Sequence, residues 1–304
     1  MHAHDHSGDR RRLAIALALI LALMSVEVAG GILAHSVALL ADAGHNFGDV
    51  VGLLLAWGAH GLSGRRPTRR YTYGFGSASI LAALLNAIIL LMATGAIAWE
   101  AVHRLLAPTE VAGLTVMVVA LIGIVINGVS AWLLMAGSKS DLNVRGAFLH
   151  IATDLAAFAG TAVAGAVILA TGWNRADPLA SLGVAALIFW SSFLLLREST
   201  RILLDVAPQE PADVAQAMLE LPKVSQVHDL HVWTVGSGFP SVSAHVLVEP
   251  GADCHAIRRD LAVLLAERYG LSHSTLQVEH AHTTAAGAGH LPLVTPPGRR
   301  TASK

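Results

Sequence analysis

Six segments of this 304-residue chain are each long and apolar enough to cross a lipid bilayer, which takes about 20 residues of α-helix. A helix suits that environment because it hydrogen-bonds all its backbone groups within one segment. Hydrophobic residues make up 54% of the sequence and charged residues only 13%, whereas about a quarter of a soluble domain is charged. We therefore predict a membrane bundle of six helices. The predicted spans are Leu13–Ala34, Val37–Leu62, Ser77–Leu106, Val111–Met135, Val144–Ala170 and Pro178–Leu196.

The basic residues near the span ends predict how the bundle is oriented. Lysine and arginine concentrate after the second, fourth and sixth spans, whereas the other side has only Arg104 and Arg175 near its span ends. Cytoplasmic loops carry the excess of basic residues in membrane proteins. We therefore expect both chain termini in the cytoplasm, and the even number of spans agrees with both termini lying on one side.

After the sixth span the composition becomes that of a small soluble domain. Pro208 and Pro211 mark a linker. The pattern that follows predicts, in order, a helix, two strands of a hairpin, an amphipathic helix and a third strand. The predicted elements are Ala212–Leu221, Gln226–Val235, Ser241–Glu249, Cys254–Tyr269 and Ser274–Glu279. The order α-β-β-α-β is typical of a small α+β sandwich.

These patterns divide the chain into four parts. Residues 1–12 are a histidine-rich arm, residues 13–205 the six-helix transmembrane domain, and residues 206–283 the α+β domain. Residues 284–304 are rich in Ala, Gly, Pro and Thr and are predicted to be disordered. The arm contains His2, His4 and His6, which would bind metal weakly.

Two H-x-x-x-D patterns place ionisable side chains inside predicted spans. His45 and Asp49 lie in the second span, and His150 and Asp154 lie in the fifth. Residues four apart share one face of a helix, and ionisable groups in a span usually mark an ion or proton path. Two imidazole nitrogens and two carboxylate oxygens are a plausible tetrahedral set for zinc. Either pattern alone could instead be a buried hydrogen-bonded couple.

Other protein classes fit the sequence less well. The net charge of −1 gives no indication of nucleic-acid binding, and a single cysteine, Cys254, excludes an intramolecular disulfide and a cysteine-based zinc motif. An intramembrane zinc peptidase needs H-E-x-x-H, but Asn46 and Ile151 occupy the glutamate position. A membrane metal sensor that does not transport remains an alternative.

The chain resembles the cation diffusion facilitators over roughly residues 10–282. The motifs that carry the resemblance are Ala41–His45 with Asp49, His150 with Asp154, Tyr73–Gly76, Asp177–Pro178 and Val227–Trp233. The resemblance implies a homodimeric exporter of divalent metal that exchanges the metal for protons. It also implies six spans and a cytoplasmic domain of ferredoxin-like, metallochaperone-like fold. Histidine rather than aspartate at the first motif position resembles the zinc-preferring bacterial branch, which implies a bacterial inner membrane.

The resemblance also implies two zinc sites. The transport site would be His45, Asp49, His150 and Asp154, and a cytoplasmic site would be His228, His245, His280 and His282. His280 and His282 are two apart and share a strand face, whereas His228 and His231 do not unless a bulge intervenes. The cytoplasmic histidines could instead be solvated residues. The exported metal could instead be Cd, Co, Ni, Fe or Mn.

Proton exchange would follow from the charge of the transport site. When zinc leaves, two carboxylates remain in a poorly hydrated bundle, and histidine titrates near pH 6.5, within roughly a unit of neutrality. Protonating His45 and His150 would neutralise the empty site and remove two ligands.

Some positions depart from the family pattern or have no assigned role. The Arg69–Tyr73 segment lacks the zinc ligands that some relatives have before span three, so we expect no second site there. Ser77 replaces a lysine that pairs with an aspartate, so we expect no charge interlock with Asp205. Asp42 either orients His45 or caps the start of span two, and we favour the cap. The roles of Glu27 and His231 stay open, and we expect Asn46 and Asn127 to hydrogen-bond between helices.

Overall fold

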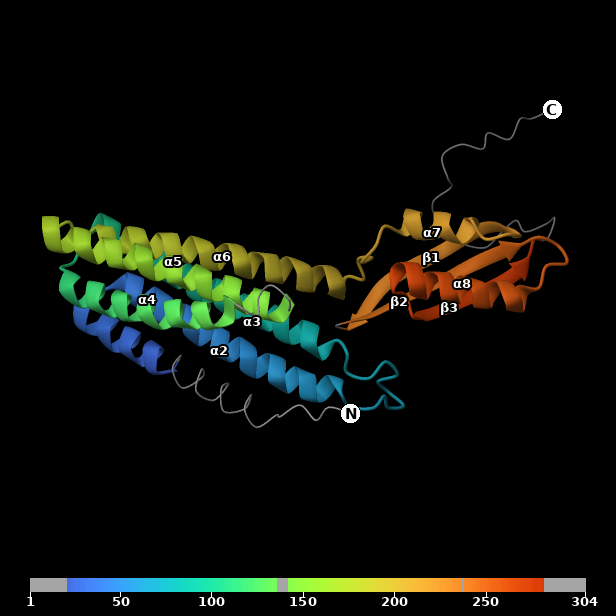
Figure 1. The fold of residues 1–304 in the computed structure, drawn as a ribbon, viewed down its shortest axis with the longest axis horizontal. Coiled ribbons are helices and arrows are strands. Elements are labelled where there is room, and N and C mark those ends of the chain that lie inside the picture. Colours follow the sequence, from blue (N-terminus) through green and yellow to red (C-terminus); the bar gives the residue numbers. More distant parts are fainter. Residues whose placement is uncertain (1–20, 136–141, 237, 282–304) are drawn as a thin grey trace, which may run out of the picture. The chain divides into compact units, whose positions relative to one another are not determined.

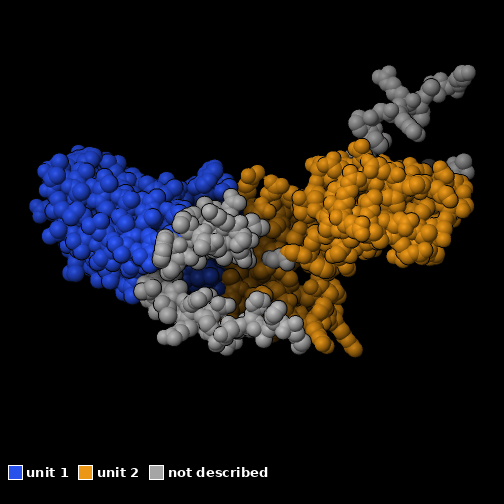
Figure 2. All heavy atoms as spheres, viewed as in Figure 1, with its two compact units in different colours: residues 1–55, 85–196 blue, residues 56–84, 197–304 orange. Residues whose placement is uncertain are grey.

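The computed structural model describes residues 21–135, 142–236 and 238–281, and over 132–135 and 142–150 it describes the backbone alone. The predicted arm, the first residues of span one, His282 and the predicted tail lie outside these residues. The chain forms two compact units, Met1–Leu55 with Leu85–Leu196, and Ala56–Leu84 with Arg197–Lys304 (Figure 2).

Helices make up the first part of the chain (Figure 1). A helix over Leu21–Ala34 precedes α2 (Val37–Ser63), α3 (Ala78–Leu106), α4 (Gly113–Met135), α5 (Leu142–Thr171) and α6 (Ala176–Leu203). The helices α2 to α5 begin and end within two residues of the predicted spans. The helix α6 continues past its predicted end, because the charged residues after Leu196 are helix formers that need not lie in lipid.

Four of the described helical segments are long and apolar enough to cross a membrane. These are Ala78–Leu106, Gly113–Ala131, Ile151–Thr171 and Ala176–Leu203. The described part of the first helix, Leu21–Ala34, is apolar but shorter. The helix α2 is not among the four, because Asp42, His45, Asn46 and Asp49 dilute its apolar residues. The protein therefore has a membrane-spanning helical domain, and six spans stay a prediction.

Glycines bring α4 and α5 close together. A Cβ atom on Gly165 would lie 2.8 Å from the backbone nitrogen of Met117, and one on Gly123 would lie 2.3 Å from Cε1 of Phe158. Small residues allow such close approach between membrane helices, where van der Waals packing stabilises association. The pairing fixes α5, the helix that contains the second H-x-x-x-D pattern.

The small domain has the predicted order of elements. Its elements are α7 (Pro211–Leu219), β1 (Val224–Gly236), β2 (Phe239–Val248), α8 (Cys254–Tyr269) and β3 (His273–His280). The strands form one sheet in the order β1-β2-β3, with β1 and β2 antiparallel and β2 and β3 parallel. Alternate residues of β2 are buried in a core shared with α7 and α8, which leaves the intervening residues on the other face of the sheet. The prediction of an α+β domain is confirmed.

A capping aspartate and a glycine define the ends of α8. The Asp253 carboxylate accepts hydrogen bonds from the backbone N–H groups of His255 and Ala256, at 3.0 and 3.1 Å. These bonds, chiefly the one from Ala256, lower the pKa of Asp253. Gly270 ends the helix with φ +69°, a conformation that favours glycine.

The second unit also contains the loop between α2 and α3. The Ser77 hydroxyl donates a hydrogen bond to the carbonyl oxygen of Val235, at 2.8 Å. A Cβ on Gly236 would lie 2.7 Å from the carbonyl carbon of Gly76, so position 236 has to stay glycine for the two segments to approach this closely. A neutral hydrogen bond therefore joins Ser77 to β1, in a place where relatives were expected to use a charge pair.

Candidate metal centre

The first H-x-x-x-D pair lies one turn apart on α2, as predicted. The distance from His45 Nε2 to Asp49 Oδ2 is 3.6 Å, and the two side chains are 14% and 29% exposed. The same imidazole nitrogen lies 3.5 Å from Oδ1 of Asp154, whose side chain is 10% exposed. His45 therefore lies between two carboxylates that come from different helices.

These separations suit a bound zinc ion. Zinc bonds to nitrogen and oxygen are about 2.0–2.2 Å long, so two ligand atoms at a tetrahedral angle are roughly 3.3–3.5 Å apart. The two distances from His45 are at or just above that value. The fourth predicted ligand, His150, lies on α5 one turn before Asp154, where only the backbone is described. Within the residues whose side chains are described, no three His, Cys, Asp or Glu residues already surround one ion-sized point.

Two further acidic residues lie near this centre. Glu27 is fully buried, and its Oε2 accepts a hydrogen bond of 2.9 Å from the Asn46 amide. Asp42 is 2% exposed and interacts electrostatically with Glu27, Asp154 and Asp49. The centre is therefore strongly acidic, and a divalent cation would offset buried charge that is otherwise costly.

The structure corrects two of our interpretations of polar residues in the helices. Asp42 lies in the second turn of α2 and does not cap it, because Ser36 and Asp177 contact the first backbone N–H groups of that helix. Asn46 does join two helices, as predicted. The prediction for Asn127 is wrong, because its amide donates to the Gly123 carbonyl of its own helix, at 3.1 Å.

A bulge in β1 gathers histidines on the open face of the sheet. His228 pairs with His245 across the strands, and their ring centroids are 5.2 Å apart. Asp229 has φ +53°, and the register shifts so that His231 pairs with Ser243, two residues from His245. The extra residue on β1 therefore places His231 on the same face as His228.

The Asp229 carboxylate joins this group. Its Oδ1 lies 3.1 Å from Nε2 of His231, and its Oδ2 lies 3.8 Å from Nε2 of His245. The sequence alone assigned no role to His231 and did not identify Asp229 as a member of this group. The signal was the H-D-x-H pattern over 228–231, but its geometry depends on the register with β2.

His280 lies elsewhere on the sheet. It pairs with Val248, a core residue of β2, and its Nε2 lies 3.0 Å from the Ala252 carbonyl oxygen and 3.7 Å from the Cys254 sulfur. The structure therefore brings His228 and His245 together and places His280 on the other face. The fourth residue of the predicted set, His282, lies outside the described residues.

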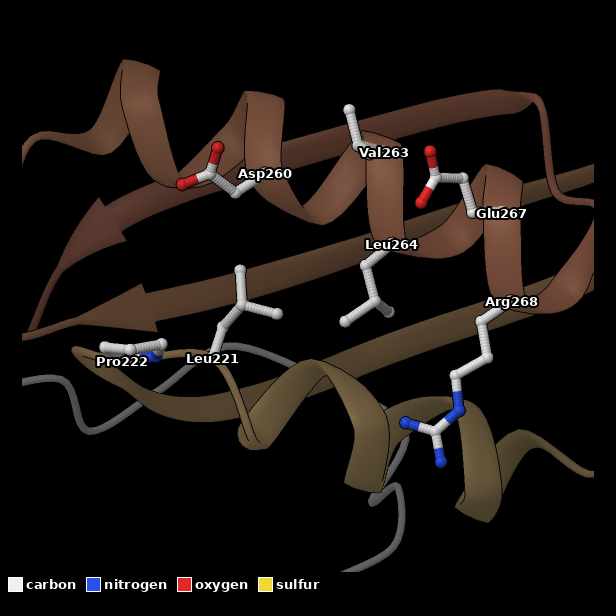
Figure 3. Close-up of a pocket in the computed structure, with 7 residues that line it drawn as sticks. All are labelled: Leu221, Pro222, Asp260, Val263, Leu264, Glu267 and Arg268. Carbon is white, nitrogen blue, oxygen red and sulfur yellow. The ribbon is translucent and has the colours of Figure 1, made fainter.

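A groove on the small domain contains none of the predicted site residues. It lies between α8 and the segment that joins α7 to β1 (Figure 3). Leucine, valine and proline side chains share its lining with three charged residues. The lining residues are Leu221, Pro222, Asp260, Val263, Leu264, Glu267 and Arg268. Because it has no histidine, we do not include it in a metal centre.

The protein combines a helical membrane domain, in which imidazole and carboxylate groups meet, with a small α+β domain. This combination is typical of a membrane protein that binds or transports cations. Comparison with known families identifies which one. Residues 13–204 match the cation efflux transmembrane domain, and residues 207–281 match the cytoplasmic domain of cation efflux proteins. The chain belongs to the cation efflux family. The family resemblance is confirmed, and the protein is a transporter rather than an enzyme.

Curated relatives match nearly the whole chain. The zinc transporter ZitB of Escherichia coli (strain K12) is 40% identical over 290 residues, 92% of each chain. The ZitB of Pectobacterium atrosepticum is 38% identical over 283 residues, 92% of this chain and 88% of the relative. The cadmium, cobalt and zinc/H(+)-K(+) antiporter of Bacillus subtilis (strain 168) is 33% identical over 294 residues, 93% of this chain and 94% of the relative.

The solved structures that match part of the chain include a domain of a relative. The metal-bound C-terminal domain of the CzcD transporter from Cupriavidus metallidurans is 30% identical. The match covers 23% of this chain and 99% of that domain, with a TM-score of 0.23.

Proposed function

We propose that the protein exports zinc from the cytoplasm in exchange for protons, through a tetrahedral site of His45, Asp49, His150 and Asp154. The observation that supports this most directly is the position of His45. Its Nε2 lies 3.6 and 3.5 Å from carboxylates of α2 and α5, at ion-ligand spacing. The zinc transporters among the relatives support zinc as the metal.

The proposed exchange follows from charge balance. Zinc neutralises the carboxylates of Asp49 and Asp154 and binds the neutral imidazoles. When the site opens to the outer side, protons compete for His45 and His150, and each protonated ring ceases to be a ligand. The protonated site is again close to neutral, so it can return through the low-dielectric bundle. One or two protons would be exchanged for each zinc ion.

The rest of the architecture is part of the proposal. Six spans over residues 13–205 would place both termini in the cytoplasm of a bacterium, in its inner membrane. Residues 206–283 would form the cytoplasmic domain, with a histidine-rich arm over 1–12 and a tail over 284–304. Two copies would pair as a homodimer in contact with membrane lipid, which the match to a family named for dimerisation of its cytoplasmic domain supports.

We propose that the cytoplasmic domain binds regulatory zinc at histidines of the predicted set His228, His245, His280 and His282, with His228 and His245 in one site and His280, on the other face of the sheet, outside it. The contact between the His228 and His245 rings supports the first two ligands. Zinc there would promote closure of the two soluble domains in the dimer.

One alternative keeps specific support. Export of another divalent metal is favoured by the relative named for cadmium and cobalt as well as zinc. The other alternative of the sequence analysis, a membrane sensor that does not transport, is disfavoured by the match to the cation efflux family.

The proposal is tested by zinc flux into proteoliposomes that contain the purified full-length protein. Asp49→Ala and Asp154→Ala should each lower flux by roughly tenfold or more, because each removes one of two carboxylates that balance the ion. The matched control is Asp260→Ala, an exposed aspartate on α8. The variants must elute from a size-exclusion column at the same volume as the wild type, which shows that they fold. Near-normal zinc flux in either site variant would then rule out this transport site.

A further inference from the structure

We propose that Asp177 is a positioning residue for the transport site: its carboxylate, on α6, caps the N-terminus of α2 and so holds the helix that carries His45 and Asp49. The proposal rests on the function proposed above. It concerns a residue that binds neither the metal nor, on our account, a transported proton.

The carboxylate of Asp177 contacts the first turn of α2 directly. Its Oδ2 accepts hydrogen bonds from the backbone N–H groups of Val37 and Ala38, at 2.7 and 3.4 Å. Its Oδ1 accepts a short hydrogen bond from the Ser36 hydroxyl. The Ser36 oxygen in turn accepts from the N–H of Leu39, at 3.1 Å. Together the two side chains satisfy backbone donors that a helix start leaves without intrahelical partners.

Burial makes this cap important. Asp177 and Ser36 are both fully buried, so water cannot replace the carboxylate as an acceptor. The negative charge also lies at the positive end of the α2 dipole. Asp177 is 140 residues from Val37 in the chain, so the cap both defines the start of α2 and joins α6 to α2.

The geometry argues against a role as a metal ligand. Val37 is eight residues before His45, which corresponds to about 12 Å along a helix. A carboxylate bonded to the Val37 N–H cannot also bind an ion held by His45. The carboxylate instead fixes the start of α2, and this fixes the position of His45 relative to Asp154 on α5.

The first measurement is hydrogen exchange on full-length protein in detergent. Asp177→Ala should raise the exchange rate of the amides of residues 37–40 by roughly tenfold or more, because the first turn loses its acceptors. Asp177→Asn should raise it less than about threefold, because an amide oxygen still accepts these bonds. Ser36→Ala removes the acceptor of the Leu39 N–H and the hydroxyl that donates to Asp177, but leaves the Asp177 carboxylate, and should give an intermediate rate. Asn174→Ala is the matched control, because Asn174 lies just before α6 and its side chain accepts from the Val111 N–H, which is not part of α2.

The second measurement is zinc affinity at the transport site. Binding to this site is defined as the zinc binding that the wild type shows and the Asp154→Ala variant does not. Asp177→Ala should weaken this affinity by roughly fivefold, the factor that corresponds to loss of one helix cap, and Asp177→Asn should largely retain it. This order separates a cap from a charged ligand or proton carrier, for which asparagine would be as damaging as alanine.

Two results would overturn the proposal. One is unchanged exchange at residues 37–40 in Asp177→Ala, and the other is equal loss of zinc affinity in the asparagine and alanine variants. If Asp177→Ala does not fold, the other two variants still test the cap. The cap requires the amides of residues 37–40 to exchange faster in Ser36→Ala than in Asp177→Asn. Failure of wild-type protein to bind zinc at the transport site would contradict the proposed function, whereas the exchange data would still test the cap.

Discussion

At the scale of single residues, the centre depends on one imidazole between two carboxylates. His45 Nε2 lies within 3.6 Å of carboxylate oxygens of Asp49, on its own helix α2, and of Asp154, on α5. Imidazole suits zinc, whereas carboxylate ligands suit a wider range of cations. The identity of the residue at position 45 should therefore affect which metal is carried.

We expect His45→Asp to weaken the preference for zinc over cadmium by roughly tenfold while flux still depends on a pH gradient. The reason is that a carboxylate replaces a nitrogen ligand but remains able to bind a divalent ion. The measurement is zinc transport into proteoliposomes with cadmium as competitor, with His255→Asp, on the exposed side of α8, as control. An unchanged ratio would show that position 45 does not set selectivity.

Spacing along the chain predicted pairs within one helix, whereas only the family resemblance predicted that residues of α2 and α5 meet. His45 and Asp49 were found because four residues make one helical turn. Asp177 was noticed only as part of a motif, because its partners lie 139 to 141 residues earlier in the chain. No local pattern carries that pairing.

At the scale of elements, the membrane helices were predictable because the length of each apolar segment determines where a helix begins and ends. The helices α2 to α5 follow the predicted spans closely, and the order of helices and strands in the small domain agrees as well. The bulge at Asp229 was not predictable, because it depends on which residues of β2 lie opposite. Its consequence is that His228, His231 and His245 share one face of the sheet.

The close approach of α4 and α5 gives a test of packing. Gly165→Ala should destabilise the protein by about 1–3 kcal/mol, because the new methyl group would lie 2.8 Å from the Met117 backbone nitrogen. Gly160→Ala, in the same helix, meets nothing within 4 Å and should be neutral or stabilising by up to about 1 kcal/mol. Thermal unfolding in one detergent compares the two. Equal midpoints would contradict the close packing.

The histidines of β1 and β2 give a test of the cytoplasmic site. Zinc should slow hydrogen exchange of β1 and β2 in the full-length protein, because a metal that binds the folded form stabilises it. His228→Gln and His245→Gln should each remove most of this effect, and His255→Gln should leave it. If zinc leaves exchange in both strands unchanged, these histidines are solvated residues rather than ligands.

At the scale of the whole molecule, a membrane domain and a small soluble domain each have their own core. The core cluster of the small domain contains fifteen buried residues, most of which come from its helices and strands. The sequence predicted this division from the change in composition after the last long apolar segment.

The central claim is that zinc moves against protons through the His45 centre, and one measurement tests it most directly. Zinc efflux would be followed from vesicles that contain the wild-type protein, with an imposed pH gradient that is acidic on the outer side. We predict that efflux rises with the gradient, falls when the gradient is collapsed, and is lost in Asp154→Ala at every gradient. An efflux rate that is unchanged when the gradient is collapsed or reversed would show a uniporter and contradict the account.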